Sequence, residues 1–309
     1  MNERLPHTAM GIDSSPGAIL EPIPAEHLKC PLCQGVRLQR IFEVKTCSTY
    51  GIERCGDCGF AFASPRPSAE ELDRFYTSAY FARDEETVLG YEDYRAVAEE
   101  NARRMWHEMK GFLAGRKVAS RRLLDVGCAT GGFLAEAQAE RWKCVGVEFS
   151  EFAIKVATEN FGLNVLKGDV FHPELVPGTF GLATMWHVLE HVLDPIATLE
   201  RTRDLLAPGG LLFIELPNWA SIGRQVRGAK WSQLKPPEHI NFFTPDSLST
   251  AASNAGFKVV NATSAYPSLM NEAAVRRLSR PLHLVKAGVA AIASKLGCGG
   301  YVRLLAEKV

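Results

Sequence analysis

The sequence predicts an α/β fold, in which a small metal-binding module precedes a doubly wound, mostly parallel sheet of seven strands. Three observations predict it. From residue 122 onward, short apolar runs alternate with helical patterns, which is typical of a parallel sheet with crossover helices. A glycine-rich turn at 127–132 separates the first strand from the helix that follows it. Ahead of this turn stand two Cys-x-x-Cys pairs, a spacing that argues for metal in a reducing compartment.

Apolar runs and capping residues place the individual elements of the sheet. Ser150 suits the N-cap of a helix, and Gly162 suits the position after its end. Asp194 and Thr244 each precede a proline, so each is expected to open a helix. We expect helices over 151–161, 195–206 and 246–255. Strands are expected at 122–127, 144–148, 164–167, 180–186, 210–216, 257–262 and 301–308.

Length and charge narrow the class of protein. Over 309 residues, 46% hydrophobic and 23% charged is an ordinary composition for a globular chain. The 35 basic residues balance 35 acidic ones, so the chain lacks the basic surplus of a nucleic-acid binder, which argues against a nucleic-acid partner. The sequence has neither a secretion signal nor an apolar run long enough to span a bilayer. We therefore expect a cytoplasmic protein with no transmembrane segment.

The run Leu123–Gly132 carries the strongest functional signal. Its glycines let the backbone approach a nucleotide-like ligand at a helix N-terminus. The glycine pattern of dinucleotide-binding proteins fails here, because Ala129 replaces the glycine that makes room for a pyrophosphate. Glu148 ends the next strand, where an acid suits a pair of ribose hydroxyls. The pattern favours a ligand that has a ribose and lacks a pyrophosphate.

This turn resembles the first motif of the class I S-adenosylmethionine-dependent methyltransferases, D-x-G-x-x-x-G, with Asp125, Gly127 and Gly131 at its fixed positions. The resemblance implies a Rossmann-like fold with S-adenosylmethionine as cofactor. The two glycines would lie against its methionine part, Phe149 would cover the adenine, and Asp169 would accept from the adenine amino group. Asp125 would either contact the ligand or orient the amides of the turn. The expected cofactor residues are Asp125, Gly127, Gly131, Glu148, Phe149, Asp169 and Trp186, which ends the fourth strand.

A cluster of titratable residues follows the fourth strand. In a helical turn, His187, Glu190 and His191 would share one face, beside the place where the methyl group is presented. Methyl transfer to a hydroxyl requires removal of a proton, which a neutral histidine or a metal-bound hydroxyl accomplishes near pH 7. The expected catalytic residues are His191, His239, His187 and Glu190.

The same segment resembles two groups of enzymes, the ubiquinone-biosynthesis O-methyltransferases and the small-RNA 2′-O-methyltransferases. In the latter, a Glu-x-x-Glu-His segment and a later histidine hold a divalent ion; His187 stands here at the first glutamate, and His239 corresponds to the later histidine. Three interpretations stay open. The four residues His187, Glu190, His191 and His239 bind a second divalent metal, His191 or His239 acts as a metal-free base, or the cluster is structural.

The two cysteine pairs predict a zinc ribbon. Its ligands to one structural Zn²⁺ are expected to be Cys30, Cys33, Cys55 and Cys58, brought together by the strand-like run between the pairs. Neither pair begins a helix after a strand, which argues against a thioredoxin-like redox role. The ribbon either staples a module too small to build its own core, or also contacts the acceptor or a partner.

The order of ribbon, glycine turn and histidine segment is similar to that of a bacterial group of zinc-ribbon methyltransferases, which includes deoxysugar C-methyltransferases. It implies an enzyme, an S-adenosylmethionine-dependent methyltransferase acting on a hydroxyl, or a carbon, of a small-molecule or glycan-type acceptor. One alternative is an RNA 2′-O-methyltransferase, which would need a basic groove. Another is a non-catalytic scaffold that binds the cofactor and recruits a partner through the ribbon.

The sequence also suggests how the chain is divided. The expected parts are a flexible leader at 1–28, the zinc ribbon at 29–67, a helical cap at 68–115 and the cofactor-binding domain at 116–309. Within the domain, residues 219–240 are expected to form a substrate loop and residues 271–296 a helical insert. The insert is expected to act as a lid or association surface, with peripheral membrane contact as the alternative, because basic residues flank an apolar part too short to span a bilayer.

Overall fold

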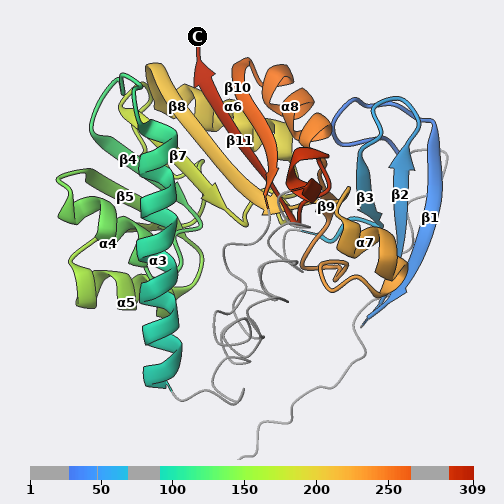
Figure 1. Cartoon of the computed structure of the whole chain (residues 1–309), viewed down its shortest axis with the longest axis horizontal. Helices are drawn as coiled ribbons and strands as arrows, with labels where there is room; N and C mark the ends of the chain where they lie inside the picture. Colours follow the sequence, from blue (N-terminus) through green and yellow to red (C-terminus); the bar gives the residue numbers. More distant parts are fainter. Residues whose placement is uncertain (1–27, 47, 69–90, 266–291) are drawn as a thin grey trace, which may run out of the picture.

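The computed structural model describes residues 28–46, 48–68, 91–265 and 292–309, except for the side chains of 91–99. Its largest part is a seven-stranded sheet in the order β10-β11-β8-β7-β4-β5-β6 (Figure 1). The strands are β4 (Arg122–Val126), β5 (Lys143–Glu148), β6 (Asn164–Lys167), β7 (Phe180–Trp186), β8 (Leu206–Pro217), β10 (Phe257–Ala265) and β11 (Tyr301–Lys308). Strand β11 is antiparallel to both neighbours and the other pairs are parallel. The predicted α/β fold is confirmed.

Helices cover both faces of this sheet, as the alternating pattern predicts (Figure 1). On one face lie α3 (Tyr91–Leu113), α4 (Gly132–Ala139) and α5 (Glu151–Phe161); on the other lie α6 (Pro195–Leu205) and α8 (Pro245–Asn254). The expected N-caps are present: the side chains of Ser150, Asp194 and Thr244 each accept from a backbone amide three residues on.

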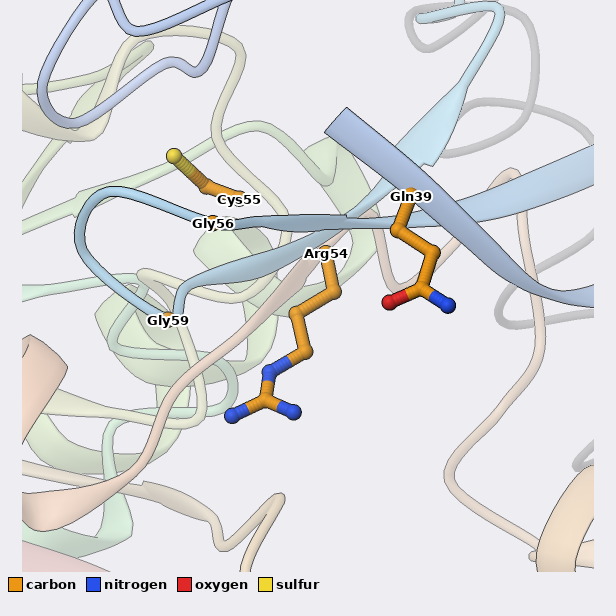
Figure 2. Close-up of a pocket in the computed structure, with 5 residues that line it drawn as sticks. All are labelled: Gln39, Arg54, Cys55, Gly56 and Gly59. Carbon is orange, nitrogen blue, oxygen red and sulfur yellow. The ribbon is translucent and has the colours of Figure 1, made fainter. Parts of the chain in front are cut away.

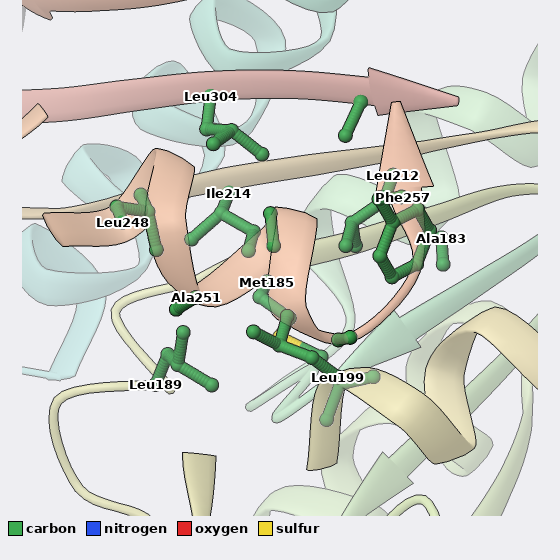
Figure 3. Close-up of a cluster of buried hydrophobic side chains, with 14 of the residues drawn as sticks. Ala183, Met185, Leu189, Leu199, Leu212, Ile214, Leu248, Ala251, Phe257 and Leu304 are labelled. Atoms are coloured by element: carbon green, nitrogen blue, oxygen red, sulfur yellow. The ribbon is translucent and has the colours of Figure 1, made fainter. Parts of the chain in front are cut away.

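The sheet is buried on both faces because its central strands carry apolar side chains on both of them. Along β8, Leu212 and Ile214 face α6 and α8, whereas Leu211 and Phe213 face α3 and α4. Figure 3 shows the first of these two layers, with Leu199 of α6 and side chains of α8 against the strands. Burying each such side chain contributes about 1.5–3 kcal/mol, which explains why continuous apolar runs form the centre of the sheet.

A second sheet of four strands carries the ribbon. It has the order β1-β2-β3-β9, all antiparallel. Strands β1 (Leu38–Lys45), β2 (Thr49–Cys55) and β3 (Ala61–Ser64) come from the ribbon, but β9 (Asn241–Phe242) comes from the chain that follows β8. The two-residue pairing of β9 with β3 therefore joins the ribbon to the large domain.

The predicted substrate loop at 219–240 packs on the ribbon sheet rather than extending away from it. It contains the short helix α7 (Ile222–Arg227) and a 3₁₀ turn at Gly228–Lys230. Trp219 and Trp231 share a buried cluster with Ile52 of β2 and Phe242 of β9. The ribbon therefore packs directly against this loop.

Several expectations fall outside the described residues: the leader up to residue 27, the part of the cap at 69–90 and most of the 271–296 insert. The rest of the expected cap contains α3. Among the residues that are described, no helix is long and apolar enough to cross a membrane.

Candidate functional site

The glycine turn lies at the carboxyl end of β4, between β5 on one side and β7 on the other. The strand order reverses at this point, and ligands of such sheets bind there. Gly127 and Gly131 have φ values of 68° and 78°, in the left-handed region that favours glycine. A Cβ at position 131 would lie 2.5 Å from Leu163 Cδ1 and 2.9 Å from Ala157 Cβ. Glycine at 131 is thus required both by the backbone and by the close approach of α5.

Glu148, at the end of β5, directs its carboxylate at this turn. It accepts from the amide of Ala129 at 3.0 Å and from those of Phe149 and Ser150 at 2.9 Å. Three backbone donors fix the carboxylate and leave it about one free lone-pair position of four. Phe149, the next residue, is 46% exposed, so its ring is free to cover a bound ligand. The arrangement suits a ribose, whose hydroxyls would use the free position or replace the Ala129 amide.

Asp125 is buried and does something the sequence did not predict. Its Oδ1 accepts from the hydroxyl of Thr184, its neighbour on β7, at 2.6 Å. The amides of Gly127 and Cys128 donate to the Val147 carbonyl at 2.9 and 3.2 Å, so these turn amides are oriented by β5 and not by Asp125. Burial raises the pKa of Asp125 to about 7 and outweighs the hydrogen bond from the Thr184 hydroxyl, which lowers the pKa.

Two further expected cofactor residues lie at the same end of the sheet. Asp169 follows β6, and its Oδ1 accepts from the amide of Phe171 at 2.9 Å. Trp186 ends β7, with its ring centroid 5.4 Å from that of Phe133 and 4.8 Å from that of Phe213. Its indole N–H is buried and finds no acceptor among the described residues. Both assignments stay predictions.

The histidine segment after β7 forms a turn, and the expectation of a helical turn there is wrong. His187 takes a φ of 56°, in the left-handed region, and its amide donates to the Glu215 carbonyl at 2.8 Å. The His191 amide then reaches the Val188 carbonyl at 2.9 Å, closing a tight turn. Because this turn is tight, the side chains of His187 and His191 nevertheless both lie close to Glu190.

His191 and His239 are held in the same tautomer. The Nδ1–H of His191 donates to the Glu238 carbonyl at 2.8 Å, and that of His239 donates to the Gln233 carbonyl at 2.9 Å. Since a carbonyl only accepts, each neutral ring carries its lone pair on Nε2. The rings lie edge to face, 4.7 Å apart, and the three ligand atoms of Glu190, His191 and His239 lie within 4.8 Å of one another.

Glu190 is 2% exposed, and the groups around it set its charge. Burial raises the pKa of Glu190, but the hydrogen bond from His187 at 3.2 Å and the nearby imidazoles outweigh it and bring the value to about 2. Burial lowers the pKa of His239 to about 3, aided by the neighbouring His191. The cluster therefore holds one carboxylate and a neutral His239 near pH 7.

A second buried carboxylate, that of Glu215 of β8, lies next to this cluster. Its Oε1 lies 3.8 Å from His187 Nε2, and its Oε2 accepts from Arg303 Nε at 2.5 Å. Arg303 also donates to Glu108 of α3 at 2.6 Å. Burial lowers the pKa of His187, but the two carboxylates Glu190 and Glu215 raise it above the ordinary value overall. His187 is thus placed between two acids and lies outside the three-residue set.

The cysteine pairs converge as predicted. Cys30 and Cys58 Sγ lie 3.5 Å apart, as do Cys33 and Cys55 Sγ, and all four sulfurs lie within 4.8 Å of one another. A Zn²⁺ tetrahedron with bonds of about 2.3 Å has sulfurs about 3.8 Å apart, so the cage has the right size. The Asp57 amide donates to Cys55 Sγ at 3.4 Å, which favours the thiolate.

A cavity of about 410 Å³ lies beside this cysteine cage. It is lined by Gln39, Arg54 and the 55–59 turn (Figure 2). Its lining includes neither the glycine turn nor the histidine cluster, so it is a feature of the ribbon and lies apart from both.

A comparison with known families matches residues 98–262, more than half of the chain, to the model described as a methyltransferase domain. The chain belongs to the class I S-adenosylmethionine-dependent methyltransferases. The matched span of this methyltransferase contains the glycine turn, Glu148 and the histidine cluster, and leaves out the ribbon.

Two O-methyltransferases are similar in sequence to this chain. The ubiquinone biosynthesis O-methyltransferase of Azoarcus sp. (strain BH72) is 32% identical over 183 residues, 55% of this chain and 76% of the relative. That of Thiobacillus denitrificans is 32% identical over 188 residues, 55% and 77% of the two chains. Among solved structures, an Archaeoglobus fulgidus S-adenosylmethionine-dependent methyltransferase superposes with a TM-score of 0.51 at 20% identity, covering 74% of this chain and 100% of the other. This last likeness shows the fold.

The structure adds three polar residues to the site of the methyltransferase that the sequence did not indicate: Thr184, Glu215 and Tyr301. Tyr301 begins β11 and lies edge to face with His187, 5.1 Å between ring centroids. Burial and the charges of Glu215 and Glu190 raise the pKa of its hydroxyl. A polar residue inside or at the end of an apolar strand was the available signal in each case.

Proposed function

We propose that the chain transfers the methyl group of S-adenosylmethionine to a hydroxyl of a small-molecule acceptor, whose proton is removed at Glu190, His191 and His239. One observation carries this proposal. Both imidazoles donate Nδ1–H to a backbone carbonyl, so the Nε2 lone pairs of two neutral rings are held beside one buried carboxylate. A proton-transfer site requires such rings, with the tautomer fixed and the free lone pair directed at the reacting group.

At this edge of the sheet, the cofactor residues and the histidine cluster take separate roles in the reaction. The acceptor oxygen attacks the methyl carbon in line with the sulfur, the methyl–sulfur bond breaks, and the sulfonium becomes a neutral thioether. Glu148 and the turn around Gly127 would hold the cofactor for this attack, with Phe149 and Asp169 at the adenine. The hydroxyl proton would pass to Nε2 of His191 or His239. Neutral histidine is the correct form for this step at pH 7.

The same three residues suit a divalent transition metal. Two imidazoles and a carboxylate are the ligand set of Zn²⁺, Fe²⁺ or Mn²⁺ more than of Mg²⁺. Two features fit such an ion: carbonyls hold the other nitrogen of each ring, and Oε2 of Glu190 has no hydrogen-bond partner among the described residues. A bound ion would lower the pKa of a coordinated hydroxyl. His187 would orient Glu190 instead of binding the ion.

A metal count tests this assignment. Protein purified without chelator and loaded with Mn²⁺ is expected to bind one ion that the His239→Ala variant does not bind, in addition to any metal in the cysteine cage. Equilibrium dialysis with elemental analysis measures both. The His107→Ala variant, on the exposed part of α3, serves as control. Equal Mn²⁺ binding by parent and His239→Ala would exclude the metal and leave metal-free base catalysis.

The cysteine cage is proposed to hold one structural Zn²⁺ through Cys30, Cys33, Cys55 and Cys58. The distances between the sulfurs and the burial of Cys30 and Cys55 support it.

The relatives support oxygen as the methylated atom, since both are named O-methyltransferases. Their acceptor is not proposed for this chain, because the ribbon lies outside the matched domain and packs against the 219–240 loop. A cofactor with a deuterated methyl group, incubated with cell-extract metabolites, gives the direct test. A small molecule gaining the heavy methyl on oxygen with the parent, and not with His239→Ala, is expected. Label found in RNA, or on carbon, would overturn the acceptor class.

The cofactor assignment predicts that Glu148→Ala weakens binding of S-adenosylmethionine at least about tenfold. The change removes the acceptor for the ribose hydroxyls, and each such charge-assisted bond contributes about 1.5–3 kcal/mol. Titration calorimetry measures the affinity. Glu151→Ala is the matched control, because Glu151 is exposed and pairs with Lys167 on the surface. Parental affinity in Glu148→Ala would refute the ribose role.

A further inference from the structure

The segment that leaves the ribbon makes hydrogen bonds to the backbone around the histidine cluster. Arg66 lies two residues beyond β3, with its guanidinium partly buried. Its Nη2 donates to the carbonyls of Val192 at 3.1 Å and Leu193 at 2.7 Å, and its Nη1 donates to Asn241 Oδ1 at 3.1 Å. One ribbon side chain thus contacts both the turn that carries His191 and the strand that follows His239.

Asn241 ties the same two segments from the other side. Its amide and that of Ile240 donate to the Glu190 carbonyl at 3.0 and 2.9 Å. Its side-chain Nδ2 donates to the carbonyls of Leu189 at 3.0 Å and Val192 at 2.7 Å, and the residue is 1% exposed. Every polar group of the Asn241 side chain is used, and the acceptor among them is used by Arg66.

The ribbon holds this arrangement through its backbone as well. In the pairing of β3 with β9, Phe62 lies opposite Asn241, and the Ala63 amide donates to the Ile240 carbonyl at 3.0 Å. The register of the ribbon strand therefore fixes where Arg66 reaches the histidine segment.

We propose that Arg66 is a positioning residue for His191 and His239, and that the ribbon through it is part of the methyl-transfer machinery. The inference rests on the proposed function only for what the two histidines do. His191 is adjacent to Val192, and His239 is two residues before Asn241, so Arg66 joins the two backbones that set the separation of the Nε2 atoms. Displacements of about 1 Å at such groups cost about 10²-fold in rate.

The geometry requires arginine at this position. Three acceptors surround one planar guanidinium, and a lysine ammonium, a compact charge on a flexible stem, cannot meet all three in these directions. Burial lowers the pKa of Arg66 to about 10, so the group stays charged near neutral pH.

The test compares Arg66→Lys with Arg37→Lys. Arg37 lies on the same ribbon but is 74% exposed and pairs with Asp57 on the surface, so the same substitution there costs little. Amide exchange is followed by mass spectrometry for peptides covering 187–193 and 238–243, with peptides from β4 and β5 as internal reference. Ring ¹⁵N spectra of His191 and His239 report the tautomer, and calorimetry reports cofactor affinity.

In Arg66→Lys we expect exchange in both histidine peptides to rise at least about tenfold, the Nδ1–H tautomer signature to weaken, and cofactor affinity to stay within about twofold. Arg37→Lys should match the parent. Parental exchange and ring spectra in Arg66→Lys would overturn the inference. So would an equal rise in the β4 and β5 peptides, because it would make Arg66 a general stabiliser. These readouts need no acceptor, so they stand apart from the proposed function, which fails if both His191→Ala and His239→Ala keep full turnover.

Discussion

Replacing His239 with alanine is expected to lower turnover by roughly 10² to 10⁴ while leaving the affinity for S-adenosylmethionine nearly unchanged. The proton of the acceptor is transferred only on the way to the transition state, so a group that receives it lowers that barrier and contributes little to cofactor binding. His239 is 4% exposed, and its Nε2 lies beside Glu190 and His191. His191→Ala should behave in the same way if the two imidazoles act together.

The measurement is single-turnover transfer with the acceptor identified by the deuterated-methyl screen, alongside calorimetry of the cofactor. His107→Ala controls for the loss of an imidazole elsewhere, because His107 is exposed on α3. Non-additive losses in the His191→Ala, His239→Ala double variant would indicate one functional unit. Full turnover in both single variants would show that the proton leaves by another route.

The expectations that the sequence met are those that depend on local patterns. Apolar runs define the seven strands, and Ser150, Asp194 and Thr244 cap the helices where their side chains predict. Gly127 and Gly131 have the backbone angles that their motif implies. Each of these features depends on a few neighbouring residues, so a single chain is enough to predict it.

The features that were missed depend on contacts between distant residues. Thr184 meets Asp125 because β4 and β7 pair in one register, and Glu215 meets Arg303 across β8 and β11. Strand β9 has two residues and exists only because β3 lies beside it. The turn at His187 departs from a helix because His187 takes a left-handed φ of 56° at the point where its amide meets the Glu215 carbonyl.

Loss of a ribbon cysteine is the second change expected to have a large effect. Cys55→Ser should abolish copurifying zinc and unfold the ribbon. Binding of structural zinc contributes about 10–16 kcal/mol to folding, which is comparable with the whole stability of a domain. Cys55 is buried in the same cluster as Phe60, Phe62 and Phe243 of the large domain. Disorder in the ribbon should therefore extend through β9 to the histidine cluster.

The half of the sheet that binds the cofactor is expected to survive this change. One face of β4, β5 and β6, covered by α4 and α5, buries its side chains in a second cluster, to which no ribbon residue belongs. Cys55→Ser should therefore keep cofactor affinity within a few-fold while amide exchange rises in the ribbon and at 238–243. Cys298→Ser is the matched control, as Cys298 lies outside the cage. Elemental analysis that finds no zinc in parent protein never exposed to chelator would refute the metal, and unchanged exchange at 238–243 would mean that the histidine cluster holds its geometry without the ribbon.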